Sequence, residues 1–119
     1  MANPERGEVE VYIGDGGEAR ILRYDWGALA ATMRESGAKT YDDLHVALSL
    51  VDMNVVLVAL FHGLRSGGEK TLKRGDLDGL SGDIRPVRTA IMEAVNLALG
   101  VRNEEGTATS GNVREKAGA

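Results

Sequence analysis

The chain has 119 residues, which is enough for one domain and too few for two cores of ordinary size. Its 18 acidic and 14 basic side chains give a formal net charge of −4, which argues against a basic face for duplex nucleic acid. Cysteine is absent, which excludes disulfides, thiolate metal sites and cysteine nucleophiles and fits a reducing cytoplasm.

The N-terminal part of the chain predicts a β-hairpin. Residues 8–13 alternate polar and apolar side chains, so that Val9, Val11 and Ile13 share one face of a strand. A glycine-rich turn follows, and residues 18–24 read as the returning strand. Because an isolated hairpin is only marginally stable, we expect the rest of the chain to cover its apolar face.

A first helix is predicted over residues 25–36. Asp25 is a suitable N-cap and Gly37 a suitable C-terminal stop. The spacing of three and four residues places Leu29, Met33 and Trp26 on its apolar side. We interpret Trp26 as an anchor at the edge of the core, with a binding hot spot as the alternative.

A second, short helix is predicted over residues 41–50. Thr40 and Asp43 resemble a capping box in which aspartate replaces glutamate, and the two acids Asp42 and Asp43 are interpreted as capping groups. The side chains expected to be buried are Leu44, Ala47, Leu48 and Val51.

The next helix, over residues 53–66 with Asp52 or Asn54 as its N-cap, is apolar on nearly every side and is therefore expected to be the central one. The stretch 44–64 contains one formally charged residue, Asp52, and needs examination as a membrane span. Burying that carboxylate in a bilayer would cost about 2.5–3.5 kcal/mol. We therefore predict two soluble helices broken at Asp52.

Residues 66–83 contain five glycines and predict an ordered connection with one helical turn, held to the body by Leu72, Leu77 and Leu80. A strong amphipathic helix follows over 84–99, with Pro86 in its first turn and Gly100 as its stop. Its apolar stripe comprises Ile84, Val87, Ile91, Val95 and Leu99 or Ala98.

Together these elements predict an α+β, mainly α fold: an N-terminal β-hairpin, then about four helices. The domain organisation is a lead over 1–7, a single globular domain over 8–100, and a tail over 101–119. Within the domain, the hairpin covers 8–24 and the helical body 25–100. The tail lacks apolar periodicity, so we expect it to be disordered.

Three segments resemble ligand loops and fail on spacing or context. The glycines of 14–19 loosely match a dinucleotide fingerprint, but a strand follows them where a helix is needed. In 63–71, Glu69 separates the glycines from Lys70, so a phosphate loop is out of register and a helix C-cap at Gly67-Gly68 is preferred. A calcium loop around 76–79 would place arginines at carboxylate positions.

No catalytic constellation remains. His45 and His62 are the only histidines, and there is no carboxylate three residues after His45 or four residues after His62, so we interpret both as surface or boundary residues and not as a base or metal ligand. We therefore expect no enzyme activity, no cofactor and no metal. A cationic cluster, interpreted as a solvated connection with an acidic partner as the alternative, comprises Arg65, Lys70, Lys73 and Arg74.

Three motifs occur in order along the chain: one opens the hairpin, a second lies on the first helix, and a third closes the central helix. They are Arg6-Gly7-Glu8-Val9, Gly27-Ala28-Leu29-Ala30 and Gly63-Leu64-Arg65-Ser66-Gly67-Gly68. Over about residues 3–100, this order of segments resembles the small tail assembly chaperones of tailed phages and gene transfer agents. The chain departs from the family at Trp26, where an aliphatic residue is more usual, at 31–33, where the family continues with acids, and in its extra tail.

This resemblance implies a non-enzymatic morphogenesis protein of the bacterial cytoplasm. Such chaperones escort the long helical tape measure protein while tail tube subunits polymerise around it, and they are absent from the mature particle. The implied partners are the tape measure protein and the tail tube protein, without nucleic acid or membrane, and a homo-oligomer stays open. Helix-in-groove contact on the helical body would suit such a partner.

We expect partner binding on the first helix and the cationic cluster, with the acidic hairpin steering the partner by charge. The expected residues are Trp26, Gly27, Ala30, Ala31, Arg65, Lys70, Lys73 and Arg74. Two alternatives stay open: a small acidic adaptor such as an antitoxin or a transcription-complex component, and an enzyme whose site is assembled across an oligomer. A nucleic-acid adaptor would need a basic stripe, which only 65–74 could begin to supply.

Overall fold

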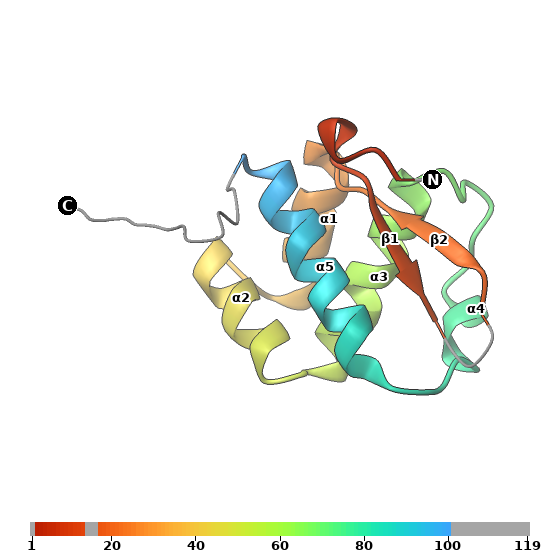
Figure 1. Ribbon diagram of the computed structural model, residues 1–119. Helices are drawn as coiled ribbons and strands as arrows, with labels where there is room; N and C mark the ends of the chain where they lie inside the picture. Colours follow the sequence, from red (N-terminus) through yellow and green to blue (C-terminus); the bar gives the residue numbers. More distant parts are fainter. Residues whose placement is uncertain (1, 14–16, 101–119) are drawn as a thin grey trace.

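The structure, a computed structural model, describes residues 2–13 and 17–100 (Figure 1). The predicted α+β, mainly helical fold is confirmed. The elements are a short 3₁₀ turn η1 (Pro4–Arg6), β1 (Val9–Tyr12), β2 (Ala19–Leu22), α1 (Trp26–Ser36), α2 (Tyr41–Ser49), α3 (Met53–Ser66), α4 (Gly75–Asp78) and α5 (Ile84–Ala98). The predicted hairpin tip at 14–16 and the predicted disordered tail at 101–119 lie outside the described residues.

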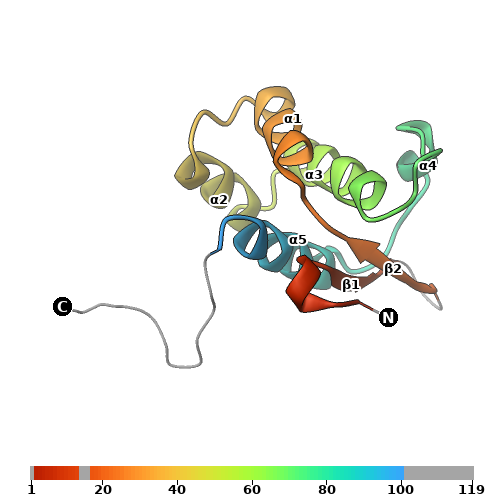
Figure 2. The same ribbon diagram turned by 90° about the horizontal axis from the view of Figure 1, so that it is seen from above.

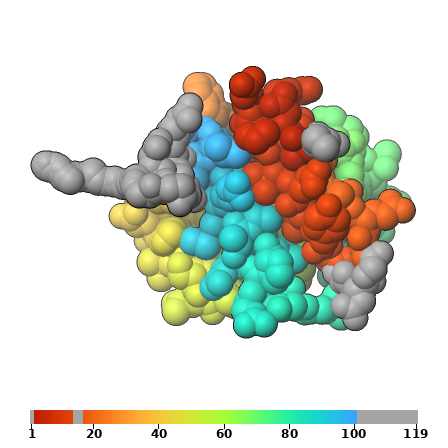
Figure 3. Space-filling view, viewed as in Figure 1, coloured from red at the N-terminus to blue at the C-terminus, as the bar shows by residue number. Residues whose placement is uncertain are grey.

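The body has two layers, which are clearest from above (Figure 2). The hairpin and α5 form one layer, and α1 and α3 form the other. Helix α2 closes one end of the body against α3 and α5, and α4 lies toward the other end. On the face seen in Figure 3, α5 forms a band between α2 and the hairpin.

The hairpin is antiparallel, with Val9 opposite Leu22 and Val11 opposite Arg20. The alternation predicted for the first strand is confirmed, because Val9 and Val11 are buried and Ile13 packs against the core. Strand β1 lies on α5 and strand β2 lies on α3, so the helical body covers the apolar side of the hairpin as expected.

Each of the long helices begins at an oxygen-bearing N-cap side chain. Asp25 accepts a hydrogen bond from the Ala28 amide at 2.7 Å, and Asp52, not Asn54, caps α3. Asp83 caps α5 by accepting from the Arg85 amide at 3.0 Å, a cap that the sequence analysis did not assign. These bonds satisfy amides that the helix itself leaves without partners.

The capping box at α2 is half formed. The Thr40 hydroxyl oxygen accepts from the Asp43 amide at 3.1 Å, as predicted. The Asp43 carboxylate accepts from the Lys39 amide at 3.2 Å instead of returning to the amide of Thr40. A capping box uses glutamate or glutamine at this position, and the shorter aspartate bonds one residue earlier in the chain.

Helix α3 is central, as predicted. It packs against α1, α2, α5 and β2, and half of its residues are buried. Two glycines allow it to approach the hairpin closely. A Cβ on Gly63 would lie 2.7 Å from Leu22 and from the Tyr24 ring, and one on Gly67 would lie 2.8 Å from the Ile21 carbonyl carbon.

These two glycines belong to the third motif of the family resemblance. Gly63 also accepts, through its carbonyl oxygen, a hydrogen bond from the Arg23 amide at 3.1 Å. The backbone of α3 therefore extends the hydrogen bonding of β2 at the end of the strand. The predicted C-cap is confirmed in position, with Gly67 as the C-cap and Gly68 at a φ of 131°.

Five apolar side chains are more exposed than predicted. Trp26 is 82% exposed, because the aromatic side chain that enters the core at the start of α1 is Tyr24, two residues earlier. Leu80 follows the end of α4 and is 37% exposed, whereas Leu72 and Leu77 are buried anchors. At the end of α5, the half-buried residue is Ala98 and not Leu99. In and after α2, Ala47 and Val51 are only half-buried.

Among the described residues, no single helix has the length and apolarity to cross a bilayer, and α2 with α3 reaches that threshold only as a pair bent by 115°.

Burial of Tyr24 predicts a loss of stability in alkali. Its hydroxyl donates to the Ala59 carbonyl at 2.5 Å, and burial raises the pKa of Tyr24 far above its ordinary value of 10.0. The unfolded chain can therefore ionise this phenol above about pH 10 while the folded chain cannot. The contribution of the buried Tyr24 phenol to the free energy of unfolding is therefore intact below pH 10 and falls by about 1.4 kcal/mol per pH unit above it.

Denaturant unfolding measured between pH 8 and pH 11.5 tests this prediction. Tyr24→Phe should be less stable than wild type near neutral pH and lose less stability as the pH rises. Tyr12→Phe is the matched control, because Tyr12 is 58% exposed. An equal alkaline slope for Tyr24→Phe and wild type contradicts the prediction.

Candidate functional site

The first predicted part of the binding surface is a ridge along α1. Trp26, Ala30 and Arg34 recur every four residues, and all are exposed, together with Gly27. The opposite side of α1 packs through the buried residues Leu29 and Thr32. Ala31, by contrast, is half-buried. We refer to Trp26, Gly27 and Ala30 as the α1 ridge.

On one flank of the ridge, Trp26 borders an open hollow of about 470 Å³. The hollow lies between η1, the end of β2 and the end of α5. Its lining includes Arg6, Arg23, Leu97 and Ala98. The Arg23 Nε donates to the Arg6 carbonyl at 3.1 Å, which ties η1 to the segment that enters α1. Glu5 and Asp25 also line the hollow, so Trp26 lies beside an apolar helix end and side chains of both charges.

The other flank of the ridge holds the cationic cluster, arranged around a buried ring. The guanidinium carbons of Arg74 and Arg65 lie 4.3 Å and 5.5 Å from the centroid of Phe61. Cations at this distance over an aromatic face are attracted by its quadrupole. Lys70 and Arg65 also line an open hollow of about 240 Å³ together with Asp25, Ala28, Phe61, His62 and Ser66.

Glu35 of α1 joins this flank. Its carboxylate forms an ion pair with Arg74, and its Oε2 lies 3.1 Å from the Nε2 of His62. Desolvation works to raise the pKa of Glu35, but the hydrogen bonds from Arg74 and His62 outweigh it and lower the pKa below its ordinary value. The stability that Glu35 contributes is therefore present above its ordinary pKa and is lost as the pH falls through the lowered value.

An ion pair with β2 fixes the start of the 66–83 connection. The Arg20 guanidinium donates to both carboxylate oxygens of Glu69, at 2.9 Å and 2.6 Å. Such a bidentate pair specifies geometry as well as contributing energy. Glu69, whose position already argued against a phosphate loop, thus joins the connection to β2, and the Glu35–Arg74 ion pair joins it to α1.

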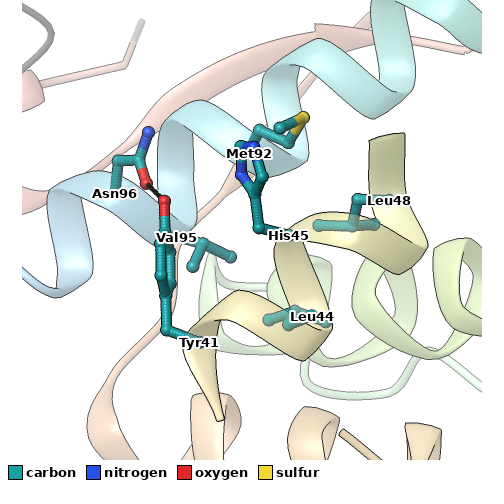
Figure 4. Close-up of a pocket in the computed structure, with 7 residues that line it drawn as sticks. All are labelled: Tyr41, Leu44, His45, Leu48, Met92, Val95 and Asn96. Atoms are coloured by element: carbon teal, nitrogen blue, oxygen red, sulfur yellow. Dashed lines mark hydrogen bonds between the residues drawn. The ribbon is translucent and has the colours of Figure 1, made fainter. Parts of the chain in front are cut away.

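A small pocket lies between α2 and α5 (Figure 4). The Tyr41 hydroxyl donates to the Asn96 side-chain oxygen at 2.6 Å across its mouth, and His45 points toward Met92. The cavity has a volume of about 10 Å³, which is at most the space of one water molecule. We therefore interpret this pocket as a small gap in the packing between α2 and α5 and not as a ligand site.

In the described part of the chain, no group of three or more histidine, aspartate or glutamate side chains has the geometry to hold a metal ion. His45 is exposed and His62 is half-buried, as predicted for surface and boundary positions.

Four of the eight predicted binding residues lie on α1, and the other four lie at the end of α3 and on the connection that follows it. Arg65 and Lys70 line one hollow, Arg65 and Arg74 share the Phe61 ring, and Lys73 is exposed on the connection. Trp26 borders the other hollow. The sequence analysis missed Glu35 and Phe61, because their partners are distant in sequence.

A scan against protein-family models, a search of curated proteins and a search of solved structures each found no match.

Proposed function

We propose that this protein is a tail assembly chaperone of a phage, prophage or gene transfer agent. In this proposal it binds the tape measure protein in the bacterial cytoplasm during tail morphogenesis, performs no catalysis and leaves before the particle is complete. The proposal starts from the three motifs that resemble this family. The structural observation that supports it best is the α1 ridge, which keeps a tryptophan 82% exposed beside Gly27 and Ala30.

The ridge is suited to a helical partner. Glycine and alanine allow a second helix to approach closely, because they have little side chain to separate the two backbones. A tryptophan at the end of such a surface offers a large, rigid apolar area, and this residue type is enriched among the side chains that dominate binding energy. A tape measure protein presents long amphipathic helices, so the ridge could cover one of them until the tail tube replaces it.

The cations on the flank beside α3 would set the partner's orientation. Arg65, Lys70 and Lys73 are exposed, so they can meet acids that border an apolar stripe. Exposed charges of this kind contribute more to the rate and register of association than to its affinity. The apolar contact at the α1 ridge is therefore assigned the main part of the binding energy.

Co-expression with the tape measure protein encoded beside this chain tests the proposal. We expect the tape measure protein to become soluble and to co-purify with the chain. A tape measure protein that stays insoluble, with no complex at low salt, would contradict the proposal. Binding to duplex nucleic acid in the same preparation would instead favour the adaptor.

A variant on the ridge locates the contact. Ala30→Glu places a carboxylate where a partner helix would approach, and we expect capture to weaken about tenfold or more. Ala30 is exposed, so the melting temperature should hardly change. Thr89→Glu, at an exposed position of α5, is the matched control and should leave capture intact. Equal capture by both variants would exclude the ridge as the contact surface.

A further inference from the structure

A second exposed apolar surface lies where α2 turns into α3, away from the α1 ridge. Val46 is 54% exposed, Leu50 is 77% exposed and Met53 is 46% exposed. Val46 lies on α2, Leu50 is the C-cap residue one helical turn later, and Met53 begins α3 three residues after that. We call these three residues the α2–α3 corner. The turn lies at the bottom of Figure 1, whereas α1 starts near the top.

The backbone at this corner is strained. Val51 has a φ of 56°, in the left-handed region that β-branched residues rarely adopt. Its amide donates to the Leu48 carbonyl and the next amide donates to the Ala47 carbonyl, both at 3.0 Å. This is a Schellman motif with valine at the position that glycine usually occupies. Strain of this kind clusters at functional positions.

The charged side chains within residues 40–64, the segment that forms the corner, are all acidic. Residues 40–64 contain no lysine or arginine, and their three acids are Asp42, Asp43 and Asp52. All three acids are exposed on α2 or at the start of α3. The nearby cation Arg88, on α5, donates from its Nη1 to the Ser49 carbonyl at 3.3 Å and so neutralises the end of α2. The apolar corner therefore has an acidic rim.

We infer that the α2–α3 corner is a docking surface for an amphipathic helix whose apolar stripe is bordered by lysine or arginine. Leu50 and Met53 would meet the apolar stripe, while Asp42 and Asp52 would face the flanking cations. This charge pattern is opposite to the one expected at the cationic flank of α1. The inference rests on the proposed function only in taking a tape measure helix as the natural partner.

Two synthetic peptides provide a direct test. The first is a helical peptide with leucine on one face and lysine on both borders, and the second replaces every lysine by glutamate. Titration by fluorescence anisotropy at low salt should show at least tenfold tighter binding of the lysine peptide. Equal binding of the two peptides, or no binding of either, would overturn the inference.

Variants distinguish binding of the lysine peptide at the corner from its nonspecific attraction to an acidic protein. Leu50→Ser with Met53→Ser should weaken binding of the lysine peptide about tenfold, whereas Leu80→Ser, at an exposed leucine elsewhere, should not. If the double variant and Leu80→Ser lose the same affinity for the lysine peptide, or if neither loses any, the corner is excluded as the docking surface. Folding is checked by the melting temperature of each variant, because Leu50 is 77% exposed but Met53, at 46%, and Leu80, at 37%, are partly covered by the protein.

Two double variants, each of which removes two acidic charges, test the role of the acidic rim. Asp42→Asn with Asp52→Asn removes two charges while asparagine keeps the cap of α3. We expect weaker binding of the lysine peptide and a smaller salt dependence. Glu18→Gln with Asp78→Asn removes the same charge elsewhere and serves as the control. Equal effects of the two pairs would attribute binding to net charge and overturn the inference.

Failure of this inference can be distinguished from failure of the proposed function. If the Leu50→Ser, Met53→Ser variant captures the tape measure protein as well as wild type does, the corner inference fails and the chaperone proposal stands. If the tape measure protein is never captured but the lysine peptide binds at the corner, the docking surface stands and the chaperone proposal fails. A dimer that these substitutions dissociate would show that a second copy occupies the corner and would overturn the inference.

Discussion

Replacing Gly67 by alanine should destabilise the protein by about 3 kcal/mol, because overpacking against rigid backbone cannot be relieved by a side-chain rotation. The new Cβ would lie 2.8 Å from the Ile21 carbonyl carbon and closer still to its oxygen, so the end of α3 and strand β2 must separate. That movement would also disturb the bond between the Arg23 amide and the Gly63 carbonyl. For a domain of this size we expect the melting temperature to fall by about 10–20 °C.

Gly27→Ala is the matched control in the same measurement. Gly27 lies in α1, and its added Cβ would meet only the Asp25 carboxylate, at an ordinary 3.5 Å. Alanine at an exposed helical position should therefore stabilise the protein by about 0.5–1 kcal/mol. Opposite signs for the two substitutions are the expected result. A Gly67→Ala variant that melts like wild type would show that α3 does not approach β2 this closely.

Most of the helix bounds could be predicted, because each helix carries its own start and stop signals. Asp25 and Gly37 bracket α1, and both act as the predicted caps. Thr40 caps α2, and Asp52 separates it from α3. The hairpin was predictable for a similar reason, since the two-residue alternation of 8–13 has only one arrangement that buries Val9 and Val11 together.

The contacts that build the candidate site had no local signal. Glu35 and His62 are 27 residues apart and Arg20 and Glu69 are 49 apart, so no spacing rule along one helix brings them together. Trp26 was misplaced for a related reason. Helical periodicity places Trp26 near the apolar side of α1. Which aromatic ring enters the core, Trp26 or Tyr24, depends on which one fits beside Gly63, and that depends on tertiary packing.

The α2–α3 corner is different, because its signal was present in the sequence. Once Leu44 and Leu48 define the buried side of helix 41–50, Val46 and Leu50 must lie largely away from it. The predicted burial of Val51 obscured this, since a glycine-like conformation at a valine is not foreseeable from its residue type.

Replacing Trp26 by alanine should have the largest effect on capture of the tape measure protein. Removing a tryptophan anchor from an interface typically costs about 2 kcal/mol or more, which is about a 30-fold loss of affinity. The substitution should hardly change stability, because the side chain is 82% exposed and alanine is a good helix former at the start of α1. Titration of a labelled tape measure segment, with melting curves of each variant, measures both quantities.

Tyr12→Ala is the control that distinguishes a specific anchor from a nonspecific effect of exposed aromatic area. Tyr12 is also an exposed aromatic residue, at 58%, but it lies on β1 and outside both hollows that flank α1. If Trp26 is an anchor, affinity should fall for Trp26→Ala and stay within about twofold for Tyr12→Ala. Equal small losses in both variants would mean that exposed aromatic area contributes nonspecifically. The contact would then have to be sought at the α2–α3 corner, whose variants are assayed with the same segment.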